Sequence, residues 1–162
     1  RLRGEVGVHT AGMMIMFMME DFEPQSASLQ DIDTMLDAQN FVQTVISEEW
    51  ETELFEEEME EKIINAKEHQ ERLIDNQLQE LEHRPATLAD IQKISDLLQH
   101  VQRDFPWETE RLQQKILQKL IAAQKHQEDL IDNQLQEFDP QSASRADIKK
   151  IAALYRQVLE EF

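Results

Sequence analysis

The sequence predicts an all-α protein in which short and long helices alternate as tandem helical hairpins. Three observations lead to this prediction: long segments recur almost unchanged, a helix-start signature occurs three times, and apolar residues follow a helical period. Three glycines and four prolines in 162 residues are typical of a chain with few loops. We expect the hairpins to stack into an α-solenoid or an elongated bundle, because repeats of this size bury their apolar faces only against neighbours.

Internal self-similarity is the strongest signal in the chain. The segment HQERLIDNQLQEL at 69–81 returns as HQEDLIDNQLQEF at 126–138, 57 residues later and with two mismatches. The tetrapeptide WETE at 50–53 returns at 107–110 with the same offset. These matches indicate a duplicated helical unit.

A second motif occurs in three copies, FEPQSASLQDI at 22–32, LEHRPATLADI at 81–91 and FDPQSASRADI at 138–148. Each copy reads as a linker followed by the start of a helix. We therefore expect a single helical-repeat array over residues 1–162, with units at about 9–46, 47–105 and 106–162.

The start of each short helix carries a variant of the capping box. A hydroxyl residue is followed three positions later by an aspartate, in the pairs Ser28 and Asp31, Thr87 and Asp90, and Ser144 and Asp147. A short helix of about 18 residues should follow each cap, because apolar residues continue at helical spacing. In the third copy these residues are Ile148, Ile151, Leu154, Val158 and Phe162.

The long helices are expected at roughly 48–80 and 107–137, where apolar residues again follow a helical period. We expect Ser47 to cap the first, and Pro106 to lie in the first turn of the second, where its missing N–H costs little. Trp50 and Trp107 would then begin these helices and pack against the end of the preceding short helix.

The N-terminal segment is best explained by the same repeat. Met14, Ile15, Met19 and Phe22 align with Leu73, Ile74, Leu78 and Leu81 at the end of the long helix. We therefore interpret residues 9–22 as the last turns of an earlier long helix. Since the chain lacks an initiator Met and the array lacks polar caps, we expect it to be a fragment of a longer protein.

Charge and composition restrict the partners. The formal net charge of -18 argues against direct nucleic-acid binding, which requires Lys and Arg to neutralise phosphates, and favours a basic protein partner. The longest apolar run, Met13–Met19, is far shorter than the ~20 residues needed to span a bilayer. The absence of cysteine excludes disulfides and leaves the compartment undetermined.

The sequence favours a protein that is not an enzyme and holds neither cofactor nor metal. Glycines occur only at 4, 7 and 12, so no loop is predicted to cradle a phosphate, and no Cys/His or Ser/His/Asp arrangement is proposed. One Glu80-x-x-His83 pattern resembles a bundle metal ligand set, but it has no counterpart in the second copy.

The leading functional hypothesis is a scaffold for protein–protein interaction. The alternatives are a self-assembling helical spacer, which implies a homo-oligomer, and an acidic mimic that occupies the nucleic-acid site of a basic protein. Three sets of residues are the candidates for partner contact: an apolar set on the N-terminal segment, an acidic set at the first long helix, and the repeated Asp-Asn pairs. They are Met13, Met14, Met16, Phe17, Glu56, Glu57, Glu60, Asp75, Asn76, Asp132 and Asn133.

Overall fold

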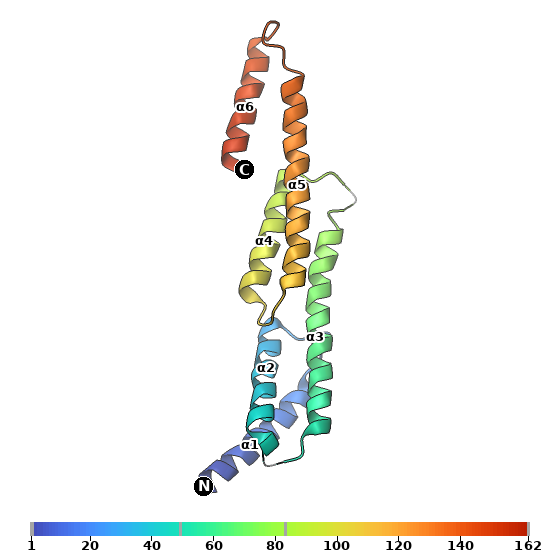
Figure 1. The fold of residues 1–162 in the computed structure, drawn as a ribbon, viewed down its shortest axis with the longest axis vertical. Helices are drawn as coiled ribbons and strands as arrows, with labels where there is room; N and C mark the ends of the chain where they lie inside the picture. Colours follow the sequence, from blue (N-terminus) through green and yellow to red (C-terminus); the bar gives the residue numbers. More distant parts are fainter. Residues whose placement is uncertain (1, 49, 83, 162) are drawn as a thin grey trace. The chain divides into compact units, whose positions relative to one another are not determined.

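A computed structural model of the chain describes residues 2–48, 50–82 and 84–161. The described residues form six α-helices and one short 3₁₀ helix, with no strand among them (Figure 1). The prediction of an all-α protein is therefore confirmed. The elements are α1 (Leu2–Asp21), α2 (Leu29–Thr44), η1 (Ile46–Glu48), α3 (Glu53–Gln79), α4 (Leu88–Asp104), α5 (Glu110–Gln136) and α6 (Arg145–Glu161).

The starts of the short helices agree with the sequence. At α2, the Ser28 hydroxyl accepts from the Asp31 backbone N–H at 3.0 Å, and the Asp31 carboxylate accepts from the Ser28 N–H at 3.0 Å. The same reciprocal pair of bonds joins Thr87 to Asp90 and Ser144 to Asp147. Each box satisfies N–H groups that have no partner within a helix, so the start of each short helix is fixed locally.

The predicted starts of the two long helices are wrong. Ser47 lies in η1, where its hydroxyl donates back to the Gln43 carbonyl, and α3 begins six residues later at Glu53. Pro106 lies in the loop before α5, which begins at Glu110. The first turn of α3 forms when the Glu56 N–H donates to the Thr52 carbonyl at 2.7 Å.

The N-terminal helix is longer than predicted, since α1 begins at Leu2 instead of residue 9. Helices α3 and α5 agree with the repeat. Each contains 27 residues, and their first residues lie 57 positions apart, which is the offset of the repeated segments. Helices α4 and α6 both contain 17 residues. The helices thus recur in the order and spacing of the sequence motifs, whereas the proposed unit boundaries remain a prediction.

The chain divides into two compact units, each with its own buried residues. The first unit comprises Arg1–Asn76 and Asp104–Thr109, and the second comprises Gln77–Arg103 and Glu110–Phe162. In the first unit, apolar residues of α1, the linker, α2, η1 and α3 form one cluster. Its members are Ile15, Met19, Phe22, Ala27, Ile32, Met35, Ala38, Val42, Ile46, Met59, Ile63 and Ala66.

Polar side chains of α3 hold the end of α1 and the linker in the first unit. The Lys62 ammonium donates to the Met19 carbonyl at 2.8 Å, close to the C-terminal end of α1, where a cation is favoured by the helix dipole. Eight residues further along α3, the Gln70 amide donates to the Ala27 carbonyl at 2.8 Å. These two bonds fix α3 against both segments that precede it.

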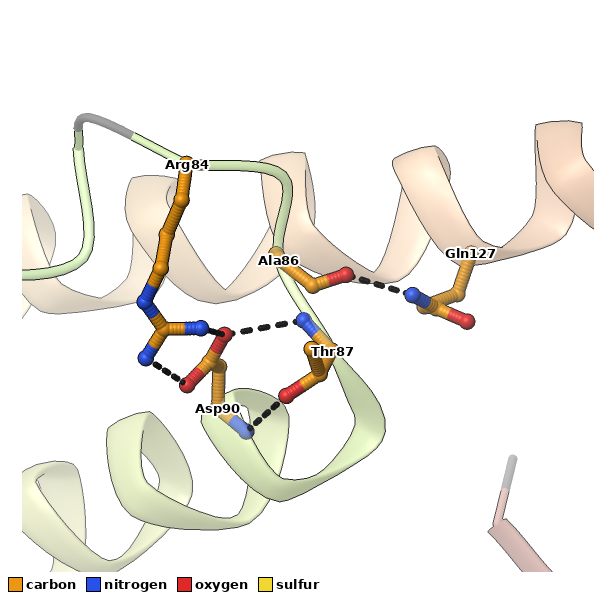
Figure 2. Close-up of polar contacts among 5 residues, drawn as sticks. All are labelled: Arg84, Ala86, Thr87, Asp90 and Gln127. Atoms are coloured by element: carbon orange, nitrogen blue, oxygen red, sulfur yellow. Dashed lines mark hydrogen bonds and ion pairs between the residues drawn. The ribbon is translucent and has the colours of Figure 1, made fainter.

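The second unit uses the equivalent side chains of α5, with the glutamine bond repeated and a carboxylate as the partner of the lysine. Lys119 pairs with the Glu82 carboxylate, and the Gln127 amide donates to the Ala86 carbonyl (Figure 2). Lys119 and Gln127 lie 57 residues after Lys62 and Gln70. The buried apolar residues of this unit are Leu78, Ile91, Ile94, Val101, Leu112, Ile116, Ala123 and Ile131.

Two adjacent isoleucines of α3 allow a matched test of the first core. Ile63 is fully buried, whereas 42% of Ile64 is exposed. We expect Ile63→Ala to lower the free energy of unfolding by about 2–5 kcal/mol, because it leaves a cavity among α1, α2 and α3. Ile64→Ala should change it by less than about 1 kcal/mol. Chemical denaturation followed by circular dichroism measures both, and equal losses would contradict this packing.

Candidate functional site

Helix α1 has one face in the core and one face in solvent. Ile15, Met19 and Phe22 are buried in the cluster with α2 and α3. The four predicted contact residues of this helix, Met13, Met14, Met16 and Phe17, are all exposed, with between 43% and 67% of their surface accessible. The methionine-rich segment is therefore partly a core element and partly an apolar surface.

A cavity of about 320 Å³ lies beside the exposed face of α1 in the first unit. We name it the methionine groove. Met13 and Met16 line it from α1, and its other large apolar lining residues are Trp50, Phe55 and Ile46. Its other lining residues are His9, Gly12, Val42, Glu51 and Thr52. The groove is thus largely apolar, and its polar side chains lie on α1 and on the loop before α3.

The Trp50 ring covers α1 at Gly12. A Cβ atom at Gly12 would lie 3.0 Å from Cζ3 of Trp50, so the absence of a side chain there allows the ring to approach the helix. One turn earlier, the His9 ring meets Trp50 edge to face, with 5.7 Å between the ring centroids. Trp50 therefore packs on α1 as well as near Ile46, and 43% of its surface stays exposed.

Two exposed apolar positions of α1 are polar in the other copies. Met16 and Phe17 align with Asp75 and Asn76 of α3, and with the pair Asp132 and Asn133 of α5. Asn76, Asp132 and Asn133 are exposed and Asp75 is half-buried, so the helices accept solvated side chains at these positions. Packing of the fold therefore does not require Met and Phe there.

The acidic candidates lie on the first turns of α3. Glu56 is half-buried, and Glu57 and Glu60 are exposed. The Glu60 carboxylate accepts a hydrogen bond from the Gln39 amide of α2. Both candidate sets belong to the first unit, but none of these three glutamates lines the methionine groove, whose lining ends on α3 at Phe55.

The repeated Asp-Asn pairs do not join this site. Asp75 and Asn76 lie near the end of α3 and do not line the groove. Asp132 and Asn133 lie on α5 and belong to the second unit. The proposal that these pairs form a recognition face stays a prediction.

The second tryptophan has a different environment. The Trp107 N–H donates to the Glu71 carboxylate at 3.2 Å, and its ring lies 4.9 Å from that of Phe105. The Lys67 ammonium sits over the ring, 5.9 Å from its centroid. Trp107 thus packs against Phe105 as predicted, but in the loop before α5. These contacts belong to the first unit, and they make the ring part of the structure instead of an open site.

An ion pair in the second unit was not predicted. Arg84 donates two hydrogen bonds of 2.7 Å to the carboxylate of Asp90, which also accepts from the Thr87 N–H (Figure 2). These bonds, first that from Thr87 and then those from Arg84, hold the pKa of Asp90 below its ordinary value. The other two copies of the linker carry Gln25 and Gln141 in place of Arg84.

A larger cavity of about 580 Å³ lies in the second unit, near this ion pair. Lys119, Glu82, Arg84 and His126 contribute to its lining. Lys119 pairs with Glu82, and Arg84 pairs with Asp90. Its charged side chains therefore already have partners. The Nε2 atom of His126 is buried without a hydrogen bond.

Comparison with known protein families, with characterised proteins and with solved structures finds no match to this chain. Among the residues that the structure describes, no helix combines the length and the hydropathy needed to cross a membrane. Nor does any group of three or more His, Asp or Glu side chains gather as metal ligands in residues 2–48, 50–82 and 84–161, a range that leaves out His83.

The glycines of α1 test the contact with Trp50. A Cβ at Gly7 would meet nothing within 4 Å, so Gly7→Ala should raise the free energy of unfolding by up to about 1 kcal/mol through helix propensity alone. Gly12→Ala should raise the free energy of unfolding by less, because the new methyl group would force the Trp50 ring to move. The indole N–H resonance of Trp50 should shift in Gly12→Ala and stay in place in Gly7→Ala. Identical spectra would contradict the contact.

The lowered pKa of Asp90 sets the sign of a pH effect. The pKa of Asp90 in the folded protein lies below the ordinary value of 3.8. The ionised carboxylate therefore stabilises the fold fully above pH 3.8, and this stabilisation is lost as the pH falls through the pKa of the folded state. Asp90→Asn should cost about 1–2 kcal/mol of the free energy of unfolding at pH 7. Denaturation curves of both proteins from pH 7 to pH 2 should converge only at the acidic end. A constant difference would contradict this assignment.

Proposed function

We propose that this chain is a non-enzymatic scaffold for protein–protein interaction, built from helical-hairpin repeats of about 57 residues that stack as a solenoid or an elongated bundle. The methionine groove of the first unit is its binding site. The sequence copies and the equal lengths of α3 and α5 support the repeat.

One observation carries the assignment of the site. Met13, Met16 and Phe17 are exposed at positions where the later copies have polar residues, namely Arg72, Asp75 and Asn76 in α3 and Asp129, Asp132 and Asn133 in α5. Exposed apolar side chains gathered beside a groove are typical of an interaction surface. Their flexible thioethers also suit the binding of varied apolar partners.

The charges around the groove indicate the chemistry of the partner. Glu51 lines the groove, and the acidic first turns of α3 follow Phe55 directly. A partner that inserts an apolar side chain and carries Lys or Arg beside it would match both features. Burial of one such apolar side chain contributes about 1.5–3 kcal/mol, whereas the exposed charges mainly raise the association rate.

The two alternatives predict different partners. A self-assembling spacer would use the same groove to bind a second copy of the chain. An acidic nucleic-acid mimic would bind a basic protein without need of the groove, and only the net charge of -18 favours it.

A photo-reactive residue in place of Met16 tests the proposal. In an extract of the source cells, we expect it to cross-link to a different protein. The purified partner should bind Met16→Asp at least about tenfold more weakly than the unaltered chain. Leu54→Asp is the matched control, because Leu54 is 82% exposed and lies outside the groove, and it should bind normally.

Three outcomes would contradict this function. Cross-links only between copies of the chain would favour the spacer. Equal binding by both Asp variants would remove the groove from the interaction. Binding that high salt abolishes and Met16→Asp leaves unchanged would favour the acidic mimic.

A further inference from the structure

The tryptophans of the two WETE motifs contact the same position of the long helix that precedes them. The Trp107 N–H donates to the Glu71 carboxylate of α3 at 3.2 Å. The Trp50 ring lies against Gly12 of α1. Gly12 aligns with Glu71 in the same frame that aligns Met16 with Asp75. The two contacts are therefore counterparts, and their chemistry can be compared.

The second copy supplies charged partners for its tryptophan from α3. The Lys67 ammonium lies 5.9 Å from the centre of the Trp107 ring, and Glu71 accepts the indole N–H. In α1, Val8 stands at the position of Lys67 and Gly12 at the position of Glu71. Helix α1 therefore offers the first tryptophan neither a cation nor a carboxylate at these positions.

The methionine groove lies where these two side chains have been replaced. Rings of three residues line it, His9, Trp50 and Phe55, together with the thioether side chains of Met13 and Met16. The Trp50 ring is 43% exposed. Aromatic rings attract a cation that lies over their faces, and the attraction is stronger when the cation has lost its water. This lining therefore suits a weakly hydrated cation.

The charge at the groove has the sign that a cation requires. Glu51 contributes to the lining, and its side chain is exposed. The described residues that line the groove include no lysine or arginine. A cation in the groove would gain from the Glu51 carboxylate, whereas an anion would be repelled by it.

The groove positions of α1 lie at the surface in the second copy as well. They are His9, Met13 and Met16, which align with Glu68, Arg72 and Asp75 of α3. The first two of these α3 residues are exposed and the third is half-buried, although the same helix buries Ile63 and Ala66 in the core. This side of the helix is thus a surface in both copies, and the copies differ in its chemistry.

We propose that the methionine groove binds the N-methylated ammonium group of a modified lysine on a partner protein, which rests on the function proposed for the groove. The positive charge lies over the Trp50 ring, as that of Lys67 lies over the Trp107 ring, and Glu51 supplies the opposite charge. The methyl groups and the lysine stem contact Met13 and Met16.

The apolar lining favours a methylated ammonium over a bare one. An unmodified lysine carries three N–H donors, and burying them without acceptors costs free energy. Met13, Met16 and Phe55 offer no strong acceptor. A trimethylated ammonium has no N–H to satisfy and keeps the charge that the ring and Glu51 attract.

Three small probes separate charge from apolar contact. They are the Nα-acetyl amides of trimethyl-lysine, of unmodified lysine and of the carbon isostere, in which a tert-butyl group replaces the trimethylammonium. Each is added to the full chain and followed by the indole N–H resonances. We expect trimethyl-lysine to shift Trp50 saturably and to leave Trp107 in place. The other two probes should bind at least about fivefold more weakly.

Variants of the chain locate the two attractions. Glu51→Gln should weaken the binding of trimethyl-lysine about two- to fivefold and leave the carbon isostere unchanged. Glu108→Gln is the matched control, because Glu108 is the exposed residue at the same place in the second WETE motif, and it should change neither. Trp50→Leu keeps an apolar side chain and should remove the preference for the charged probe. Circular dichroism checks the helix content, and the two glutamate variants decide if Trp50→Leu fails to fold.

Several results would overturn the proposal. Equal binding of trimethyl-lysine and its carbon isostere would show that the groove selects apolar groups without regard to charge, which leaves the proposed function intact. Tighter binding of unmodified lysine would indicate an ordinary basic side chain. Choline that binds more tightly than trimethyl-lysine would assign the groove to a small ligand. No saturable shift of Trp50 with any probe would refute the methylated lysine, while cross-linking at Met16 would still decide the proposed function.

Discussion

The bonds from a long helix back to the linker before the preceding short helix are the constraint on which this fold depends. A linker that folds back between two helices leaves carbonyl groups without a helical partner, and these must find donors. Gln70 and Gln127 supply them from more than 40 residues further along the chain. Helices α2 and α4 therefore each pack between the end of one long helix and the start of the next. This grouping is the same in both units and explains why their apolar residues recur in the same order.

The third copy of the linker and short helix has the same sequence motif but no glutamine bond to its linker carbonyl among the described residues. Its capping box forms with the same geometry as the others, because the box needs only residues within one turn. Its apolar face stays open, because burial needs a second helix. Local structure and packing are thus separable in this chain, since the cap forms although Ile148 and Val158 stay exposed.

The sequence was sufficient for features that depend on neighbouring residues. The helical class, the three caps and the ends of the long helices near Gln79 and Gln136 follow from motifs of a few residues. The starts of the long helices were placed too early, because Ser47 and Pro106 carry typical start signals. The threonine of each WETE motif was overlooked, although Thr52 accepts the first bond of α3.

The candidate site was only partly predictable. The methionines were identified from composition, and their polar counterparts could have been found by aligning the copies. The methionine groove could not be predicted, because Trp50 comes to α1 from a loop about 40 residues away in the sequence. The ring can approach the helix because Gly12 has no side chain. The pair of Arg84 and Asp90 could have been suspected from one difference in the sequence, because EHRPA stands where the other copies have EPQSA or DPQSA.

The exposure of the α1 methionines also makes this surface chemically distinct from the core. Peroxide converts an accessible thioether to a polar sulfoxide, and it reaches buried sulfur atoms slowly. Met13, Met14 and Met16 are open to such attack, whereas Met19, Met35 and Met59 are shielded. Mild oxidation followed by mass mapping would therefore act as a footprint of the groove, in which each methionine that a partner covers retains its sulfur unmodified. The same chemistry would convert an apolar docking surface into a polar one while leaving the core of the first unit intact.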